Sequence, residues 1–123
     1  SSKDSLFVDK NLLSLNRKIQ KAFNKQEKQV SKTIDFLNKI KTPTIICSDL
    51  NNNPFSIPYK NLSIGKKDAF VEAGDGFGHT YFFGFFPLRI DYIFVDKRLK
   101  VLSFLTFKDK LSDHKAIMAK IDF

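Results

Sequence analysis

The chain has 123 residues and a formal net charge of +8, because 21 lysines and arginines face 13 acidic residues. A single cysteine excludes an internal disulfide framework and fits a reducing compartment, and no apolar run approaches the roughly 20 residues that a bilayer-spanning helix needs. The positive charge favours polyanionic partners such as nucleic acid or phosphorylated molecules, although a solvated lysine-rich surface is the simpler explanation of the charge taken alone.

The first predicted element is a long helix from about Leu12 to Ile40. Lysines fill most of its faces, and Pro43 ends it. Its apolar residues recur at intervals of three, four and seven positions, which indicates one apolar stripe on a helix. The stripe consists of Ile19, Phe23, Val30, Ile34, Leu37 and Ile40.

A short apolar strand is predicted at Thr44–Ser48, and its continuous hydrophobic character is typical of a strand that is central in a sheet and buried on both faces. Cys47 is therefore expected to be a small core residue. A turn and a short helix are predicted to follow through Leu62, and another helical turn covers Lys67–Ala73. The glycine-rich loop Gly74–Thr80 lacks the strand-then-helix context of a nucleotide-binding loop.

Three further strands are predicted at Arg89–Val95, Val101–Phe107 and Ala116–Phe123. The last of them alternates apolar and polar residues in part, as a half-buried strand does. A helix, a strand, a loop and then three strands indicate an α+β domain in which a helix packs on one face of a sheet.

Polar residues lie at the ends of the predicted strands. Asp49 and Asn51 follow the first strand, Asp91 lies inside the apolar run RIDYIF, and Asp113 and His114 precede the last strand. A carboxylate inside an apolar strand is costly unless it is paired or hydrogen-bonded. Carboxylates suit a hard cation such as Mg²⁺, and an imidazole paired with a carboxylate suits proton transfer or phosphate contact. The set therefore indicates phosphoryl chemistry.

Each of these residues also has a structural explanation. Asp and Asn commonly cap helices and form turns, which accounts for Asp49 and Asn51, and Asp91 can pair with Arg89. His79, in the glycine loop, is assigned a structural role. The order and spacing of the whole set favour the functional explanation.

Three motifs in this order, IICSDLNNNPFS, RIDYIF and SDH, resemble the C-terminal half of the endonuclease/exonuclease/phosphatase superfamily, which has the deoxyribonuclease I-like fold. The resemblance covers the chain from about residue 15 onward. It implies half of a four-layer αββα sandwich, with one mainly antiparallel sheet and helices on one face. Residues 1–123 are then the C-terminal portion of a single domain whose N-terminal half is absent.

The resemblance also implies catalytic roles for four residues. Asp49 orients or deprotonates the attacking water, and Asn51 holds a phosphate oxygen or a second metal. His114 contacts the scissile phosphate, and Asp91 buttresses this histidine.

The implied cofactor is Mg²⁺ or Mn²⁺. Its implied ligands are Asp113, directly or through water, together with Asp49 and Asn51, and substrate contacts are implied for Tyr81, Asn51 and His114. In the family the principal metal ligand is a glutamate from the first half of the domain. The fragment alone is therefore expected to be inactive.

The implied function is metal-dependent hydrolysis of a phosphodiester or phosphomonoester, with a nuclease-like activity placed first. DNA, RNA, a lipid headgroup and an inositol phosphate all suit the motifs as substrates. The alternative is a non-catalytic basic module that binds nucleic acid or a protein partner through the lysine-rich helix.

The chain begins at Ser1 without an initiating methionine and without a signal peptide, which fits a piece of a longer protein. No membrane contact is evident in this segment from its sequence. The parent protein is compatible with either a cytoplasmic or a membrane-anchored location.

Overall fold

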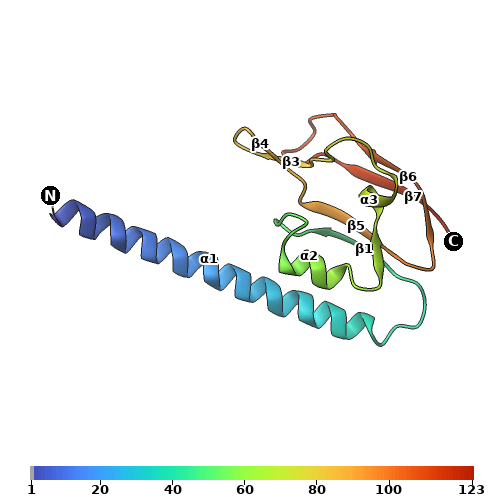
Figure 1. The fold of residues 1–123 in the computed structure, drawn as a ribbon, viewed down its shortest axis with the longest axis horizontal. Coiled ribbons are helices and arrows are strands. Elements are labelled where there is room, and N and C mark those ends of the chain that lie inside the picture. Colours follow the sequence, from blue (N-terminus) through green and yellow to red (C-terminus); the bar gives the residue numbers. More distant parts are fainter. Residues whose placement is uncertain (1) are drawn as a thin grey trace.

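The computed structural model describes residues 2–123. In chain order the elements are α1 (Ser2–Leu37), β1 (Ile45–Asp49), α2 (Ile57–Leu62), β2 (Lys66–Asp68), α3 (Ala69–Ala73), β3 (Tyr81–Phe83), β4 (Phe86–Leu88), β5 (Asp91–Asp96), β6 (Lys100–Thr106) and β7 (Ile117–Asp122) (Figure 1). The predicted helices and the four predicted strands are all present. The short strands β2, β3 and β4 are additional, because three residues are too few to show an apolar alternation.

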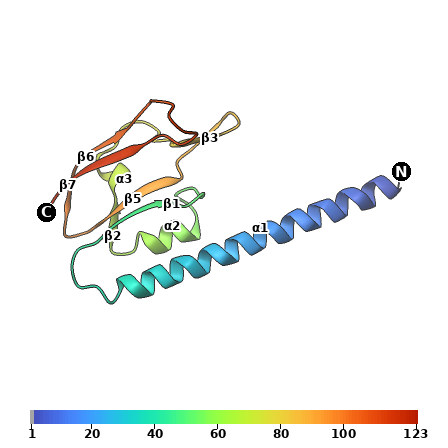
Figure 2. The same cartoon turned by 180° about the vertical axis from the view of Figure 1, so that it is seen from behind.

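Among the described side chains of α1, those that pack on the rest of the chain lie toward its C-terminal end. Val30 is buried there and Ile34 packs beside it, whereas Ile19 and Phe23 of the predicted stripe are 43% and 46% exposed. Figures 1 and 2 show the N-terminal part of α1 projecting beyond the body from both viewing directions. The apolar stripe is therefore buried only where the sheet and α2 lie beneath it. Among the described helices, none combines the length and the apolar character that crossing a membrane requires.

The central sheet has three antiparallel strands in the order β1–β5–β2. β1 lies at its edge, so the prediction of a central strand buried on both faces is wrong. Cys47 is exposed, and Ile45 is 37% exposed, whereas Ile46 packs against the helices. The central position belongs to β5, whose side chains are buried on both faces.

β5 separates two cores. Tyr92 and Phe94 point toward α1 and α2, where they pack with Val30 and other apolar residues. Ile93 and Val95 point the other way, toward the antiparallel pair β6–β7. This alternation is the normal consequence of successive side chains pointing to opposite faces of a strand.

The pair β6–β7 forms a separate two-stranded sheet, so the four predicted strands divide between two sheets, and the additional strands β3 and β4 form a third. The mixed α/β class with antiparallel strands is confirmed. Because β6–β7 packs over β5 and α3, in a core to which β1 contributes no residue, the face of β1 that carries Cys47 stays open. The site described next lies at this open face.

Candidate active site

The register of β1 against β5 brings two carboxylates together. Asp49, the last residue of β1, pairs directly with Asp91, the first residue of β5. Directly opposed residues share one face of an antiparallel sheet. Cys47 and Ile93 are the next pair on that face, which is the side of β6–β7. Both aspartates therefore face the segment that leads into β7.

His114 arrives from that segment and lies between the two carboxylates. Its Nδ1 is 2.8 Å from Oδ2 of Asp91, and its Nε2 is 3.8 Å from Oδ2 of Asp49. The first distance is within the range of a hydrogen bond to a catalytic histidine. Arg89 does not compete for Asp91, because its guanidinium pairs with Asp68 at 2.7 Å.

The surroundings of His114 raise its pKa above the ordinary value of 6.5. The main cause is the hydrogen bond to Asp91, and the nearby charges add to it, whereas partial burial opposes the increase. The protonated imidazole has two N–H donors. One is directed at Asp91, and the other is available at Nε2 on the side of Asp49.

The loop after β1 departs from the expected geometry. Asn51 has a φ of +49°, so the strand does not continue, and its side chain does not simply follow that of Asp49 on one face. The backbone N–H of Asn51 instead donates to Oδ1 of Asp49 at 3.0 Å. Gln26 of α1 holds the same loop: its amide donates to the Leu50 carbonyl and accepts from Asn52, both at 2.6 Å. The sequence offered no signal for this role of Gln26.

Asp113 lies apart from this cluster. Its side chain is exposed and accepts a hydrogen bond from Ser112 at 3.1 Å. Among the described residues, the group with metal-ligating atoms within 4.8 Å of one another consists of Asp49, Asp91 and His114. The metal roles of Asp113 and Asn51 therefore stay predictions.

Tyr81 borders the candidate site. It forms an isolated antiparallel bridge with His114, and the centroids of the two rings are 5.0 Å apart. On the other side, an open cavity of about 310 Å³ extends over Asp49 and Asp91. Its apolar wall includes Ile93. Asp49 and Asp91 line this cavity, and the imidazole of His114 lies beside both carboxylates.

Thr80 was not singled out from the sequence as a functional residue, yet it joins the two segments that carry Asp91 and His114. Its side chain is 1% exposed, and Oγ1 accepts from the backbone N–H groups of Ile90 at 3.2 Å and Asp91 at 3.3 Å. Its carbonyl accepts from the N–H of Lys115 at 2.7 Å. The signal in the sequence was its position, a threonine between the glycine loop and Tyr81.

The donor chemistry of the cluster fits a hard divalent cation. Mg²⁺ and Mn²⁺ prefer oxygen ligands, and Mg²⁺ typically keeps several waters beside one or two carboxylates. Asp49 is the best placed donor, because its side chain is 43% exposed and its Oδ2 is 3.8 Å from the imidazole. Asp91 shares one oxygen with His114, which leaves its second oxygen for any further contact.

Asp91→Asn is expected to lower the pKa of His114, because the substitution removes the charge and the best acceptor for Nδ1–H. In the wild type the pKa of His114 is raised in the folded state, so its ion pair with Asp91 stabilises the fold fully below pH 6.5. This stabilisation is lost as the pH rises through the folded-state pKa. NMR titration of the His114 ring, assigned through a His114→Gln variant, measures the change. An unchanged pKa in Asp91→Asn would contradict the paired arrangement.

Thr80→Val is expected to cost about 1–3 kcal/mol of stability, because two buried backbone donors lose their shared acceptor. It is also expected to lower the pKa of His114 by loosening Asp91. Thr80→Ser keeps the hydroxyl and serves as the matched control. Denaturant unfolding and the same NMR titration measure both effects, and a valine variant with the stability and the His114 pKa of wild type would disprove the role.

Comparison with known proteins gives consistent results. The model of the Endonuclease/Exonuclease/phosphatase family matches residues 24–114. A mannosyl-6-phosphatase from Bacteroides thetaiotaomicron has a similar structure, with a TM-score of 0.62 and 22% identity over 77% of this chain and 43% of that chain. An endonuclease/exonuclease/phosphatase family protein from Leptotrichia buccalis gives a TM-score of 0.60 and 30% identity over 75% of this chain and 40% of that chain.

A search of curated protein sequences finds no match. The chain spans less than half the length of each of the two similar structures. The family match covers most of the chain and includes Asp49, Asp91 and His114. The chain belongs to the endonuclease/exonuclease/phosphatase family.

Proposed function

We propose that the full-length protein hydrolyses a phosphoester with the help of Mg²⁺ or Mn²⁺, and that this chain carries part of the active site. The observation that carries the proposal is the placement of His114 between Asp91 and Asp49, at 2.8 and 3.8 Å. A phosphodiester of the nuclease type is the first candidate substrate. A phosphomonoester is the second, since one similar structure is named a phosphatase.

The side chains have complementary roles in such a reaction. In hydrolysis a water oxygen bonds to phosphorus while the bond from phosphorus to the leaving oxygen breaks. Asp49 accepts a hydrogen bond from the attacking water, which points a lone pair of the water oxygen at phosphorus, and takes the proton that the water loses; the leaving oxygen takes a proton from solvent. His114, protonated and held by Asp91, donates from Nε2 to a phosphate oxygen, where negative charge increases in the transition state.

The cation is assigned to the Asp49 side of the cluster, with Asp113 and Asn51 as the further proposed ligands. When bound, it neutralises charge on the phosphate and stabilises the leaving oxygen. Tyr81, beside the imidazole, is proposed to contact the substrate next to the phosphate.

We further propose that another part of the same domain completes the site. The chain covers 43% and 40% of the two similar structures, and the open face of β1 is where additional residues would approach Asp49. Residues 1–123 alone are therefore expected to be inactive and to bind Mg²⁺ weakly, since a site with few oxygen ligands holds this ion poorly.

The alternative of a basic binding module has one supporting feature, because the lysines of α1 from Lys10 to Lys32 are exposed. Such a module provides no reason for a hydrogen-bonded Asp–His pair directed at a second carboxylate. Catalysis accounts for both the pair and its position beside an open cavity.

The test is a panel of phosphodiesters and phosphomonoesters assayed with the full-length protein. We expect turnover of at least one substrate with Mg²⁺ or Mn²⁺, its loss in EDTA and its return on adding the metal. A folded protein that hydrolyses none of them, or one that is indifferent to EDTA, would contradict the proposal.

A further inference from the structure

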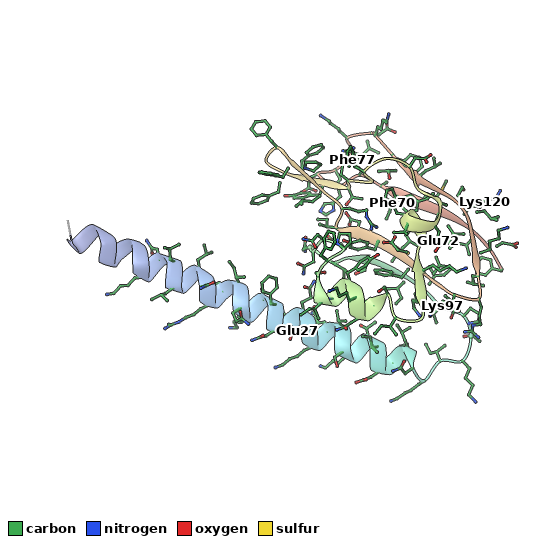
Figure 3. All side chains as sticks on the ribbon, viewed as in Figure 1. Glu27, Phe70, Glu72, Phe77, Lys97 and Lys120 are labelled. Atoms are coloured by element: carbon green, nitrogen blue, oxygen red, sulfur yellow. The ribbon has the colours of Figure 1, made fainter. Side chains whose placement is uncertain are left out.

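The hairpin β3–β4 exposes a concentration of phenylalanines. Phe85 is 100% exposed, and Phe86, Phe83 and Phe82 are 73%, 68% and 50% exposed. Figures 1 and 2 show the hairpin standing clear of the body in both views. Phe77, on the glycine loop that leads into β3, is 90% exposed as well (Figure 3). Monomeric proteins rarely leave such a contiguous apolar surface without a binding role.

The apolar residues occupy both faces of the hairpin and its tip. Phe83 pairs with Phe86 on one face, and the next pair, Phe82 with Pro87, points to the opposite face. Phe85 extends from the turn, where Gly84 has a φ of +60°. A flat protein partner would cover one face and leave the other in water. A hairpin that is apolar all round is suited to a medium that surrounds it, such as the surface layer of a lipid bilayer.

Lysines lie near the hairpin, where they can meet the phosphate groups of lipid headgroups. The segment after β6 is joined to the hairpin base by the N–H of Lys115, which donates to the Thr80 carbonyl. The Nζ atom of Lys115 lies 5.8 Å from the centroid of the Phe82 ring. The same segment carries Lys108 and Lys110 against Asp109 and Asp113, and its Leu111 is 95% exposed. Asp75, on the glycine loop that carries Phe77, lines the same cavity as Lys108 and Lys115, so the local charges nearly balance and apolar insertion is the main contribution.

We propose that the tip of the β3–β4 hairpin inserts into the surface of a lipid bilayer. Insertion is shallow, because the outer backbone N–H and C=O groups of a two-stranded hairpin need water or headgroup partners. The sequence gives no sign of this membrane contact, because a short hairpin lacks the long apolar run of a membrane-spanning helix. Tyr81 begins the same hairpin and contacts His114, so the bilayer lies beside the candidate site. If the proposed function holds, a phosphoester carried by a lipid becomes the favoured substrate class.

The chain contains no tryptophan, so Phe85→Trp introduces a reporter at the hairpin tip. The spectrum of the full-length wild type is subtracted from that of the variant. We expect a blue shift of the added emission on mixing with vesicles of phosphatidylcholine and phosphatidylserine, and quenching by brominated lipids. Phe123→Trp is the matched control, because Phe123 is 91% exposed and the C-terminal end lies across the body from the hairpin in Figures 1 and 2. Its emission is expected to stay unchanged.

A second variant, Phe83→Ser with Phe85→Ser, is expected to lose vesicle partitioning by a factor on the order of ten for each phenylalanine that is buried in the bilayer. Turnover of a water-soluble phosphoester should stay at the wild-type level, which separates this proposal from the proposed activity. Phe85→Trp emission that is already shielded from an aqueous quencher without vesicles would show that protein covers the tip. Emission that the aqueous quencher reaches equally with and without vesicles would show that the tip does not enter the bilayer. Either result overturns the proposal.

Discussion

Replacing His114 by alanine in the full-length protein is expected to lower turnover of its phosphoester substrate by a factor on the order of 10²–10⁴. The loss follows from the position of the imidazole, whose Nδ1 is held at 2.8 Å by Asp91 and whose Nε2 lies 3.8 Å from Oδ2 of Asp49. Alanine removes a charged donor that no other described side chain replaces at this point. Initial rates at saturating substrate and metal measure the effect.

His79→Ala is the matched control, because His79 is the second histidine of the chain. It lies on the other side of the same segment, where its Nε2 is 2.7 Å from Nζ of Lys115 and its pKa is lowered by burial and by that lysine. We expect its removal to leave turnover close to wild type. Near-normal turnover of His114→Ala would refute the assignment, and equal losses in both variants would indicate general disturbance of the segment.

Replacing Arg89 by alanine is expected to cost about 3–5 kcal/mol of stability, because it leaves a buried charge without its partner. The guanidinium pairs with Asp68 at 2.7 Å, and the two side chains are 11% and 5% exposed. It also lies 4.9 Å from the centroid of the Tyr92 ring and 4.8 Å from that of Phe70. Denaturant unfolding of the full-length protein, followed through a signal from this domain, measures the loss.

Arg98→Ala is the control for this prediction. Arg98 also pairs with an aspartate, Asp96, at 3.0 Å, but its side chain is 58% exposed. Exposed ion pairs contribute little to stability, so a much smaller change is expected. Similar losses in the two variants would mean that burial of the Arg89 pair is not what makes it important.

The candidate site shows how far a motif can be interpreted from sequence. Asp49, Asp91 and His114 were selected because polar residues ended or interrupted apolar strands, and the structure brings these three together. Asp113 was selected for the same reason; its exposed carboxylate accepts a hydrogen bond from Ser112, and its metal role stays a prediction. Position along the chain predicts a strand end but not the direction of a side chain in a loop.

The contacts that hold the site could not be predicted from patterns. Gln26 lies on the lysine-rich helix and reaches the loop after β1, and Thr80 joins Asp91 to the segment that carries His114. Both contacts link residues that are distant in sequence or lie on different elements. Neither glutamine nor threonine recurs in this sequence at a spacing that would indicate such a contact.

The sequence by itself determined the local elements of this protein, because the 3.6-residue stripe of α1, the apolar runs of β1 and β5 and the proline after the helix depend on neighbouring residues alone. Only the tertiary structure decided that β1 is an edge strand, that β5 is central and that β6–β7 forms a separate layer. Cys47 and Ile93 are both apolar strand residues, yet one is exposed and the other is buried. The difference arises because burial depends on which element packs over a strand, and that is a property of the whole fold.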